Sequence, residues 1–440
     1  MERQAESQLF CLKARFVTEF ICCFCCNNCC PCEKLILSSC FCFEKVPSIS
    51  IVYLQLLILL HSRYTAHIAS SPATTWEIPY NVTIATMSTN ATKKEVLEGL
   101  QVATASMCLG RATGGHNMED KVKACADAGF NGIELFYECI KLPSKRDATN
   151  GIGTFEENLI KYCKEFRTLC DKYNLKIIVM QPLKCYEGLI SKERHEKKIL
   201  KVKRYIQYCK IMDCDIILIP SMFWDDPAVT EGGDRVVQDF RELAELGAAE
   251  NPPIKFAYEV MAWGGHVDTW QKAWAVVEKV DRPNFGICLD TYHILARVYG
   301  DPTVPGCEQP NATEALLADC REMARTIDVN KIWYVQMSDA VRLDPPLSET
   351  HPWYRPEQKP WMQWSRNGRV FPLEAENGGF MPAHEILRTV VFEMGFRGWI
   401  SMEMFHASMA EPTPGLPQKQ GERAMRSWMR IIDKLSTDES

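Results

Sequence analysis

The sequence has no excess of positive charge. Its 50 lysines and arginines are outnumbered by 56 aspartates and glutamates, which gives a formal net charge of −6. A protein that holds the phosphates of a nucleic acid over a wide surface needs a broad basic surface, so we expect no nucleic-acid partner. Histidine is also scarce, with nine residues in 440, which disfavours a catalytic site built from several histidine ligands.

Long hydrophobic runs are missing as well. An apolar stretch at residues 51–60 has only about half of the roughly twenty residues that a membrane-spanning helix needs. It also lies too far from the start of the chain to be the core of a secretory signal peptide. We therefore expect no membrane partner and a cytoplasmic location.

Cysteine is unevenly distributed. Ten of the 21 cysteines lie from Cys11 to Cys42, and many of them are immediate neighbours. Metal-binding modules usually separate paired cysteines by two to four residues, so these doublets fit a zinc or iron–sulfur module poorly. An acylated segment near a membrane is one alternative, and a non-native extension is the interpretation that we favour. We expect residues 1–95 to be a Cys-rich extension, disordered or non-native and dispensable before Met87, and residues 96–440 to form the catalytic domain.

From residue 101 onward, short apolar runs alternate with amphipathic helical stretches. The expected strands are residues 102–107, 132–136, 176–180, 215–220, 254–259, 284–290, 331–336 and 398–405. The expected helices are residues 118–128, 155–173, 191–211, 235–249, 267–280, 312–327, 381–393 and 422–435. Eight strand–helix repeats predict an α/β fold of the (β/α)₈ TIM-barrel type. The competing doubly wound sheet usually carries a GxGxxG turn, and the glycines from Gly110 to Gly115 lack that order.

Polar side chains stand at the carboxyl ends of four consecutive expected strands. Glu259, Asp290 and Gln336 end theirs, and Glu403 lies within the last one. Consecutive strand ends are neighbours around the mouth of a barrel, so three acids and one amide should converge there. Any one acid alone would be read as a strand-end cap, but clustered carboxylates repel each other unless a cation lies between them. We expect a divalent metal with oxygen ligands, Mg²⁺ first and Mn²⁺ or Co²⁺ as alternatives.

Several motifs together resemble one enzyme family. They are SMCLGR at residues 106–111, GIELF at 132–136, QPLKCYEG at 181–188, VDTW at 267–270, RPNFGICLDT at 282–291 and WSRN at 364–367. With Tyr258-Glu259 and Glu403, this set resembles the fungal 3-dehydroshikimate dehydratases of quinate catabolism, within the xylose-isomerase-like barrels. The resemblance implies a metal-dependent hydro-lyase that converts 3-dehydroshikimate into protocatechuate (3,4-dihydroxybenzoate) and water. It also implies that Glu259, Asp290, Gln336 and Glu403 are the metal ligands.

The expected reaction also needs a general base and cations for the substrate carboxylate. His293, three residues after Asp290, is the first candidate for the base, although it would also suit a structural role at a helix start. His266 is the second candidate, and its alternative role is to orient a ligand. Lys184 follows the third strand, and Arg366 and Arg369 lie in the unusually long connection at residues 336–381. These three cations are candidates for binding the carboxylate.

Two other enzyme classes share this type of barrel. A sugar isomerase or epimerase would use the same metal site to stabilise an enediolate, and it remains the alternative function. A zinc AP endonuclease is disfavoured by the scarce histidines and the negative charge. The expected partner is a small-molecule substrate, and the sequence leaves the oligomeric state open.

Overall fold

A computed structural model describes residues 91–224 and 226–437. The chain divides into two units, Met1–Thr86 and Met87–Ser440, and all the described residues belong to the second. The expectations for the cysteine-rich segment therefore lie outside the described residues. The first described helix is α3 (Lys93–Glu98), which Thr92 caps by accepting the N–H of Glu95. The domain boundary expected after residue 95 falls inside this helix.

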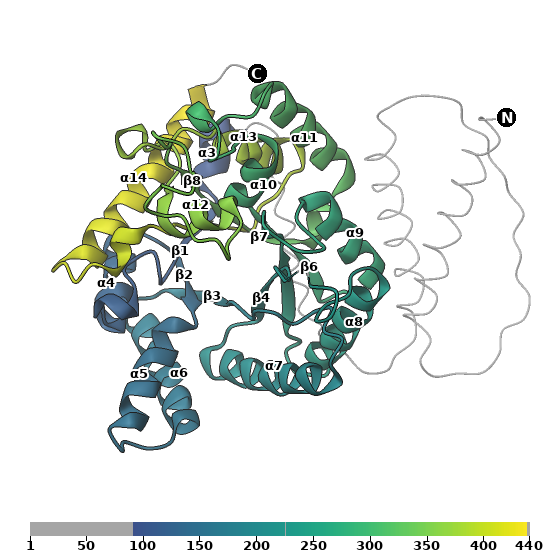
Figure 1. The fold of residues 1–440 in the computed structure, drawn as a ribbon. Helices are drawn as coiled ribbons and strands as arrows, with labels where there is room; N and C mark the ends of the chain where they lie inside the picture. Colours follow the sequence, from purple (N-terminus) through teal and green to yellow (C-terminus); the bar gives the residue numbers. More distant parts are fainter. Residues whose placement is uncertain (1–90, 225, 438–440) are drawn as a thin grey trace, which may run out of the picture. The chain divides into compact units, whose positions relative to one another are not determined.

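Eight parallel strands close into a barrel in the order β1, β10, β7, β6, β5, β4, β3 and β2 (Figure 1). Their bounds are β1 Gln101–Ala105, β2 Gly132–Phe136, β3 Lys176–Gln181, β4 Ile216–Pro220, β5 Lys255–Glu259, β6 Phe285–Asp290, β7 Ile332–Met337 and β10 Trp399–Met402. Pairing of Gln101 with Trp399 joins the first strand to the last. The predicted (β/α)₈ barrel is confirmed, and each expected strand overlaps an observed one.

Helices surround the barrel (Figure 1). They are α4 Met118–Asp127, α5 Glu138–Thr149, α6 Phe155–Lys172, α7 Lys192–Met212, α8 Asp234–Ala248, α9 Trp270–Val280, α10 Thr291–Val298, α11 Ala312–Thr326, α13 Ala383–Arg388 and α14 Leu416–Thr437. The side chain of Ser191 caps α7, as its position in the sequence predicts. The helix expected from residue 267 begins only at Trp270, because Thr269 is extended and caps it.

Two layers of apolar side chains hold the barrel together. The larger layer lies between the strands and the surrounding helices. The smaller one fills the barrel interior with mostly modest side chains, including Ala103, Val179, Leu218, Ala257 and Cys288. Such packing makes the barrel a solid support for the polar groups at its mouth.

The connection after β7 is the main departure from a plain barrel. It forms a two-stranded antiparallel ribbon, β8 (Asp339–Ala340) with β9 (Arg369–Val370), and a short helix, α12 (Pro360–Gly368). The sequence indicates a long connection here but predicts neither a helix nor a strand within it. Its elements place Arg366 on α12 and Arg369 on β9.

Candidate active site and metal centre

The four strand-end side chains lie together at one end of the barrel. Glu259 and Asp290 end β5 and β6, Gln336 lies in β7, and Glu403 directly follows β10. Asp290 pairs in register with Gln336, and Gln336 pairs with Ser401, two residues before Glu403. The exposed fraction of each of the four residues is at most 5 %. The convergence expected from strand-end positions is therefore present, while their role as ligands stays a prediction.

Arg369 supplies a buried positive charge to two of these acids. Its guanidinium lies 2.5 Å from Oδ2 of Asp290 and 3.2 Å from Oε2 of Glu403. Burial favours a neutral Asp290, but the charge of Arg369 and its hydrogen bond more than offset it and hold the pKa of Asp290 below its usual value. Burial raises the pKa of Glu403 to about 8, against the lowering effect of Arg369. One guanidinium thus compensates this acidic cluster only in part.

Glu259 has no such partner. The described side chains donate no hydrogen bond to its carboxylate, and its only ion-pair contact within them joins Oε1 to Nε2 of His293 at 3.8 Å. Burial, followed by the charges of Glu403 and Asp290, raises the pKa of Glu259 well above its usual value. A buried carboxylate without a counter-charge is costly. A cation next to Glu259 and Asp290 would remove this cost, so the carboxylates fit a divalent metal ion.

His293 completes a compact group with Glu259 and Asp290. One ligand-type atom of each residue lies within 4.8 Å of the others, and Nε2 of His293 is 3.6 Å from Oδ2 of Asp290. However, Nδ1 accepts the backbone N–H of Ala262 at 3.0 Å. Because burial lowers the pKa of His293 to about 3, the ring is neutral and carries its one proton on Nε2. In this tautomer Nε2 donates, and a role as ligand or as base would require the Ala262 hydrogen bond to break.

The amide of Gln336 faces the acids with its nitrogen. Nε2 donates to Oε1 of Glu403 at 2.8 Å and to Oε2 of Glu134 at 3.2 Å, while Oε1 faces the thiol of Cys288 at 3.4 Å. The ligand role expected of Gln336 would require its amide to turn. Glu134 and Gln181 also belong to this network and were not singled out as site residues. The available signal was the end position of Gln181 in β3 and, for Glu134, a charged residue in the middle of the otherwise apolar strand GIELF.

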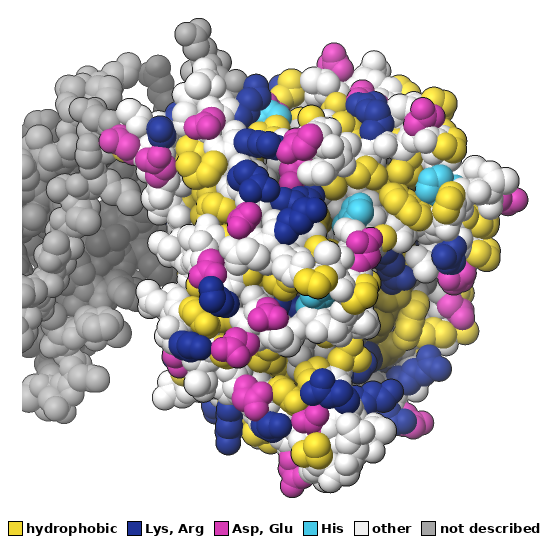
Figure 2. Space-filling model, turned by 90° about the vertical axis from the view of Figure 1, so that its left-hand side faces the viewer, with side chains coloured by type: hydrophobic (Ala, Val, Ile, Leu, Met, Phe, Trp, Pro, Cys, Tyr) yellow, Lys and Arg dark blue, Asp and Glu magenta, His cyan; other side chains and the backbone are white. Residues whose placement is uncertain are grey.

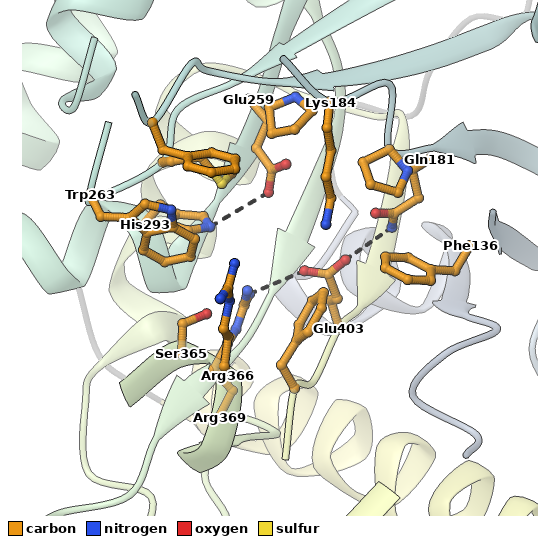
Figure 3. A pocket seen from close by; sticks show the side chains of 15 residues that line it. Phe136, Gln181, Lys184, Glu259, Trp263, His293, Ser365, Arg366, Arg369 and Glu403 are labelled. Atoms are coloured by element: carbon orange, nitrogen blue, oxygen red, sulfur yellow. Dashed lines mark hydrogen bonds and ion pairs between the residues drawn. The ribbon is translucent and has the colours of Figure 1, made fainter. Parts of the chain in front are cut away.

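A cavity of about 80 Å³ opens over these residues (Figure 3). Phe136, Phe223, Trp263 and Phe405 give it flat apolar walls, and Glu259, His293, Arg369 and Glu403 also line it. Figure 3 shows Lys184 pointing between Glu259 and Glu403. The cavity therefore combines aromatic walls with an acidic floor.

Lys184 and Arg366 bring two positive charges to the same cavity. Neither head group forms a hydrogen bond or ion pair with a described residue. Desolvation, followed by the charge of Arg366, lowers the pKa of Lys184. Desolvation and then Arg111 likewise lower the pKa of Arg366. Two neighbouring cations without a partner are suited to bind an anionic group.

His266 lies apart from this cavity. It is half-buried and its Nε2 is 3.2 Å from the hydroxyl of Thr230, and it is not among the residues that line the cavity. The structure therefore does not bring this second candidate base to the site.

The charge of the surface and the length and polarity of the helices are relevant to the expectations about nucleic-acid and membrane partners. Figure 2 shows lysine and arginine side chains mixed with aspartate and glutamate across the face in view. Within the described residues, every helix is too short or too polar to cross a membrane. Their eleven cysteines are all buried free thiols.

Comparison with known proteins adds a family and several relatives. Residues 122–432 match the sequence profile of the family described as xylose isomerase-like TIM barrel. A 3-dehydroshikimate dehydratase of Neurospora crassa is 39% identical over 340 residues, which cover 76% of this chain and 94% of the relative. A 3-dehydroshikimate dehydratase of Pseudomonas aeruginosa is 29% identical over 304 residues, covering 67% of this chain but 37% of the relative.

Solved structures share the fold. A fusion protein of a xylose isomerase-like TIM barrel with 4-hydroxyphenylpyruvate dioxygenase matches with a TM-score of 0.56 and 24% identity, over 76% of this chain and 43% of the other. The IOLI protein with a bound zinc atom matches with a TM-score of 0.52 and 16% identity, over 76% and 99%. At these identities the structural likeness shows the fold alone. The sequence profile and the Neurospora relative show more: the chain belongs to the xylose isomerase-like TIM barrel family.

Proposed function

We propose that the chain is a 3-dehydroshikimate dehydratase, which converts 3-dehydroshikimate into protocatechuate and water. The observation that carries this proposal is the cavity, in which Lys184 and Arg366, cations without a partner among the described residues, lie next to a buried carboxylate cluster. The relative from Neurospora crassa with that name, at 39% identity, supports the same activity. A substrate that carries both a ring carboxylate and a ketone matches the two parts of the cavity.

The reaction removes a proton from the carbon next to the ketone and then a hydroxyl group from the adjacent carbon. The proton and the hydroxide leave together as water, and loss of a further ring proton to the former ketone oxygen makes the ring aromatic. Negative charge develops on the ketone oxygen during the first step. Catalysis therefore requires positive charge or hydrogen-bond donors near that oxygen and a proton acceptor near the carbon.

The residues of the cavity divide these tasks. Lys184 and Arg366 bind the ring carboxylate, and the apolar walls formed by Phe136 and Phe405 exclude water from the ring. His293 donates a hydrogen bond from Nε2 to an oxygen of the substrate as charge develops there and keeps its proton. Glu259 and Glu403 are the carboxylates that line the cavity, and either one can accept the proton when it is ionised and not bound to a metal.

Glu259, Asp290 and Glu403 would also hold a divalent metal, with Gln336 as a fourth ligand once its amide turns. Oxygen ligands favour Mg²⁺, with Mn²⁺ or Co²⁺ as alternatives. Such an ion supplies Lewis-acid stabilisation of negative charge on the ketone oxygen. We place the enzyme in the cytoplasm, because the eleven described cysteines are free thiols, as is typical of a reducing compartment.

A direct assay tests the activity. Purified protein is incubated with Mg²⁺ and 3-dehydroshikimate, and the ultraviolet band of the aromatic product is followed over time. The same preparation is offered ketoses as a control. Isomerisation or epimerisation of a ketose without formation of the aromatic band would reject the dehydratase and favour a sugar isomerase or epimerase.

A further inference from the structure

Glu134 lies beneath the site and has no role in the functions assigned so far. It belongs to β2, is fully buried and does not line the cavity. Four side chains from three other strands donate hydrogen bonds to it. These are Gln181 Nε2 at 2.8 Å, Tyr334 Oη at 3.2 Å, Gln336 Nε2 at 3.2 Å and the hydroxyl of Ser401.

Two of these donors connect Glu134 to Glu403. Nε2 of Gln181 lies 3.0 Å from Oε1 of Glu403, as the dashed line in Figure 3 shows, and Nε2 of Gln336 lies 2.8 Å from the same oxygen. An amide nitrogen carries two protons, so each amide can donate one to Glu134 and the other to Glu403. Two parallel amide bridges therefore join the buried carboxylate to the one that lines the cavity.

We propose that Glu134 is a positioning residue that fixes Glu403 through the amides of Gln181 and Gln336. A carboxylate accepts hydrogen bonds and donates none, so it holds both amides with their nitrogens toward the acids. A neutral amide at position 134 would turn a donor toward this network. One bridging amide would then have to rotate and place its oxygen against the carboxylate of Glu403.

Stability alone does not account for Glu134. Its partners are neutral, and a buried carboxylate with neutral partners costs more than an apolar side chain of similar size. Both of its oxygens are occupied by donors, so it is not placed as a metal ligand. A positioning role explains why Glu134 lies below the three acids Glu259, Asp290 and Glu403. This inference rests on the proposed function, in which Glu403 acts in the cavity.

Metal affinity and kinetics of paired variants test the positioning. Mn²⁺ binding is measured by calorimetry, and kcat and KM with 3-dehydroshikimate are measured in parallel. We expect Glu134→Gln to weaken Mn²⁺ binding about 10- to 100-fold and to lower kcat more than it raises KM. Glu134→Asp, which keeps the charge but shortens the reach, should be impaired in the same way. Glu187→Gln, a buried glutamate outside the network, is the matched control and should retain Mn²⁺ binding.

Two comparisons can overturn the inference. The first is Mn²⁺ binding at the wild-type level in a folded Glu134→Gln variant. The second is wild-type Mn²⁺ binding in Glu134→Asp together with weakened Mn²⁺ binding in Glu134→Gln, because the charge at position 134, and not its reach, would then matter. The double variant Glu134→Gln/Gln181→Ala should lose less than the sum of the two single losses, since both act through one bridge. Additive losses would contradict the bridge.

Two further measurements apply if the Glu134 variants do not fold or if the proposed function is wrong. If the Glu134 variants do not fold, Gln181→Ala removes one of the two bridging amides and leaves Glu134 in place, and unchanged Mn²⁺ binding in that folded variant would reject the positioning. If the wild-type chain binds no Mn²⁺ and forms no aromatic product, the proposed function fails instead. The positioning is then read from nuclear magnetic resonance of the Gln181 and Gln336 side-chain amides in Glu134→Asp, whose shorter side chain no longer reaches both amides. Side-chain amide protons that exchange slowly with solvent in the wild type and faster in the variant support the positioning. Identical exchange rates in the two proteins reject it.

Discussion

The imidazole ring of His293 accepts the backbone N–H of Ala262 at Nδ1, and this bond leaves Nε2 as the ring's donor. Because a glutamine amide can place an N–H near the position of Nε2, we expect His293→Gln to retain kcat within about tenfold. His293→Ala and His293→Asn should lose about 10²- to 10³-fold, as when a preorganised donor is removed. Steady-state kinetics across pH provide the measurement.

The same variants test the base role expected from sequence. If His293 were the base, all three variants would be equally impaired, and each would lose the acidic limb of the pH–rate profile. The metal content of the variants tests a third possible role of His293, that of a metal ligand. Asp290→Ala should lose the metal, and a similar loss in His293→Ala would make His293 a ligand.

Glu403→Ala should abolish turnover without unfolding the barrel. The substitution removes a proposed ligand and one partner of Arg369, while the apolar layers around the strands stay intact. Metal content and circular dichroism are measured together with activity. Glu411→Ala, at an exposed position in the loop that follows, serves as the control. Normal turnover with normal metal content in Glu403→Ala would rule out this role.

Lys184→Met and Arg366→Met should each raise KM for 3-dehydroshikimate about 10- to 100-fold, because each removes a charged hydrogen-bond donor to the substrate carboxylate. Lys192→Met is the matched control, since the side chain of Lys192 is 90% exposed at the start of α7. KM values that stay at the wild-type level in both variants would show that the carboxylate binds elsewhere.

Glu187 predicts a pH dependence of stability. Burial raises its pKa from 4.5 to about 7, and one carboxylate oxygen has no hydrogen-bond partner within the described residues. A raised folded-state pKa stabilises the protein fully below pH 4.5, and this contribution is lost as the pH rises through 7. The shift corresponds to roughly 3 kcal/mol in the free energy of unfolding. We therefore expect Glu187→Gln to be more stable than the wild type at pH 8 but not at pH 4.5.

Urea unfolding at the two pH values measures this effect. Glu278→Gln, a substitution at an exposed position on α9, is the control. An equal difference between Glu187→Gln and the wild type at both pH values would mean that Glu187 does not titrate in this range.

The sequence predicts the strands well because each is a short apolar run whose bounds are set by its own residues. It also predicts that Glu259, Asp290, Gln336 and Glu403 meet, since strand ends are neighbours in any closed barrel. It does not predict the tautomer of His293, which depends on the backbone of Ala262, 31 residues earlier. The helix α12 was missed because its start, Pro-Trp-Met, lies in a segment rich in turn-forming residues.

Arg369 illustrates the same limit. Its position in the long connection indicates a loop cation that faces the substrate, yet the ribbon of β8 and β9 carries it into the acidic cluster. Only the three-dimensional path of the connection distinguishes a charge that neutralises the site from one that binds the substrate. Arg366, three residues earlier on α12, has no hydrogen-bond or ion-pair partner for its head group among the described residues.

The pairing of β1 with β10 has a consequence for the order in which the molecule is completed. A ribosome releases the chain from its N-terminal end, so the seven earlier strands emerge before the last one. Until then, β1 and β7 present unpaired edges that invite association with other nascent chains. Glu403 arrives with that same last strand. Closure of the barrel and chemical competence are therefore acquired in one late event, and a chain cut short before residue 399 would lack both.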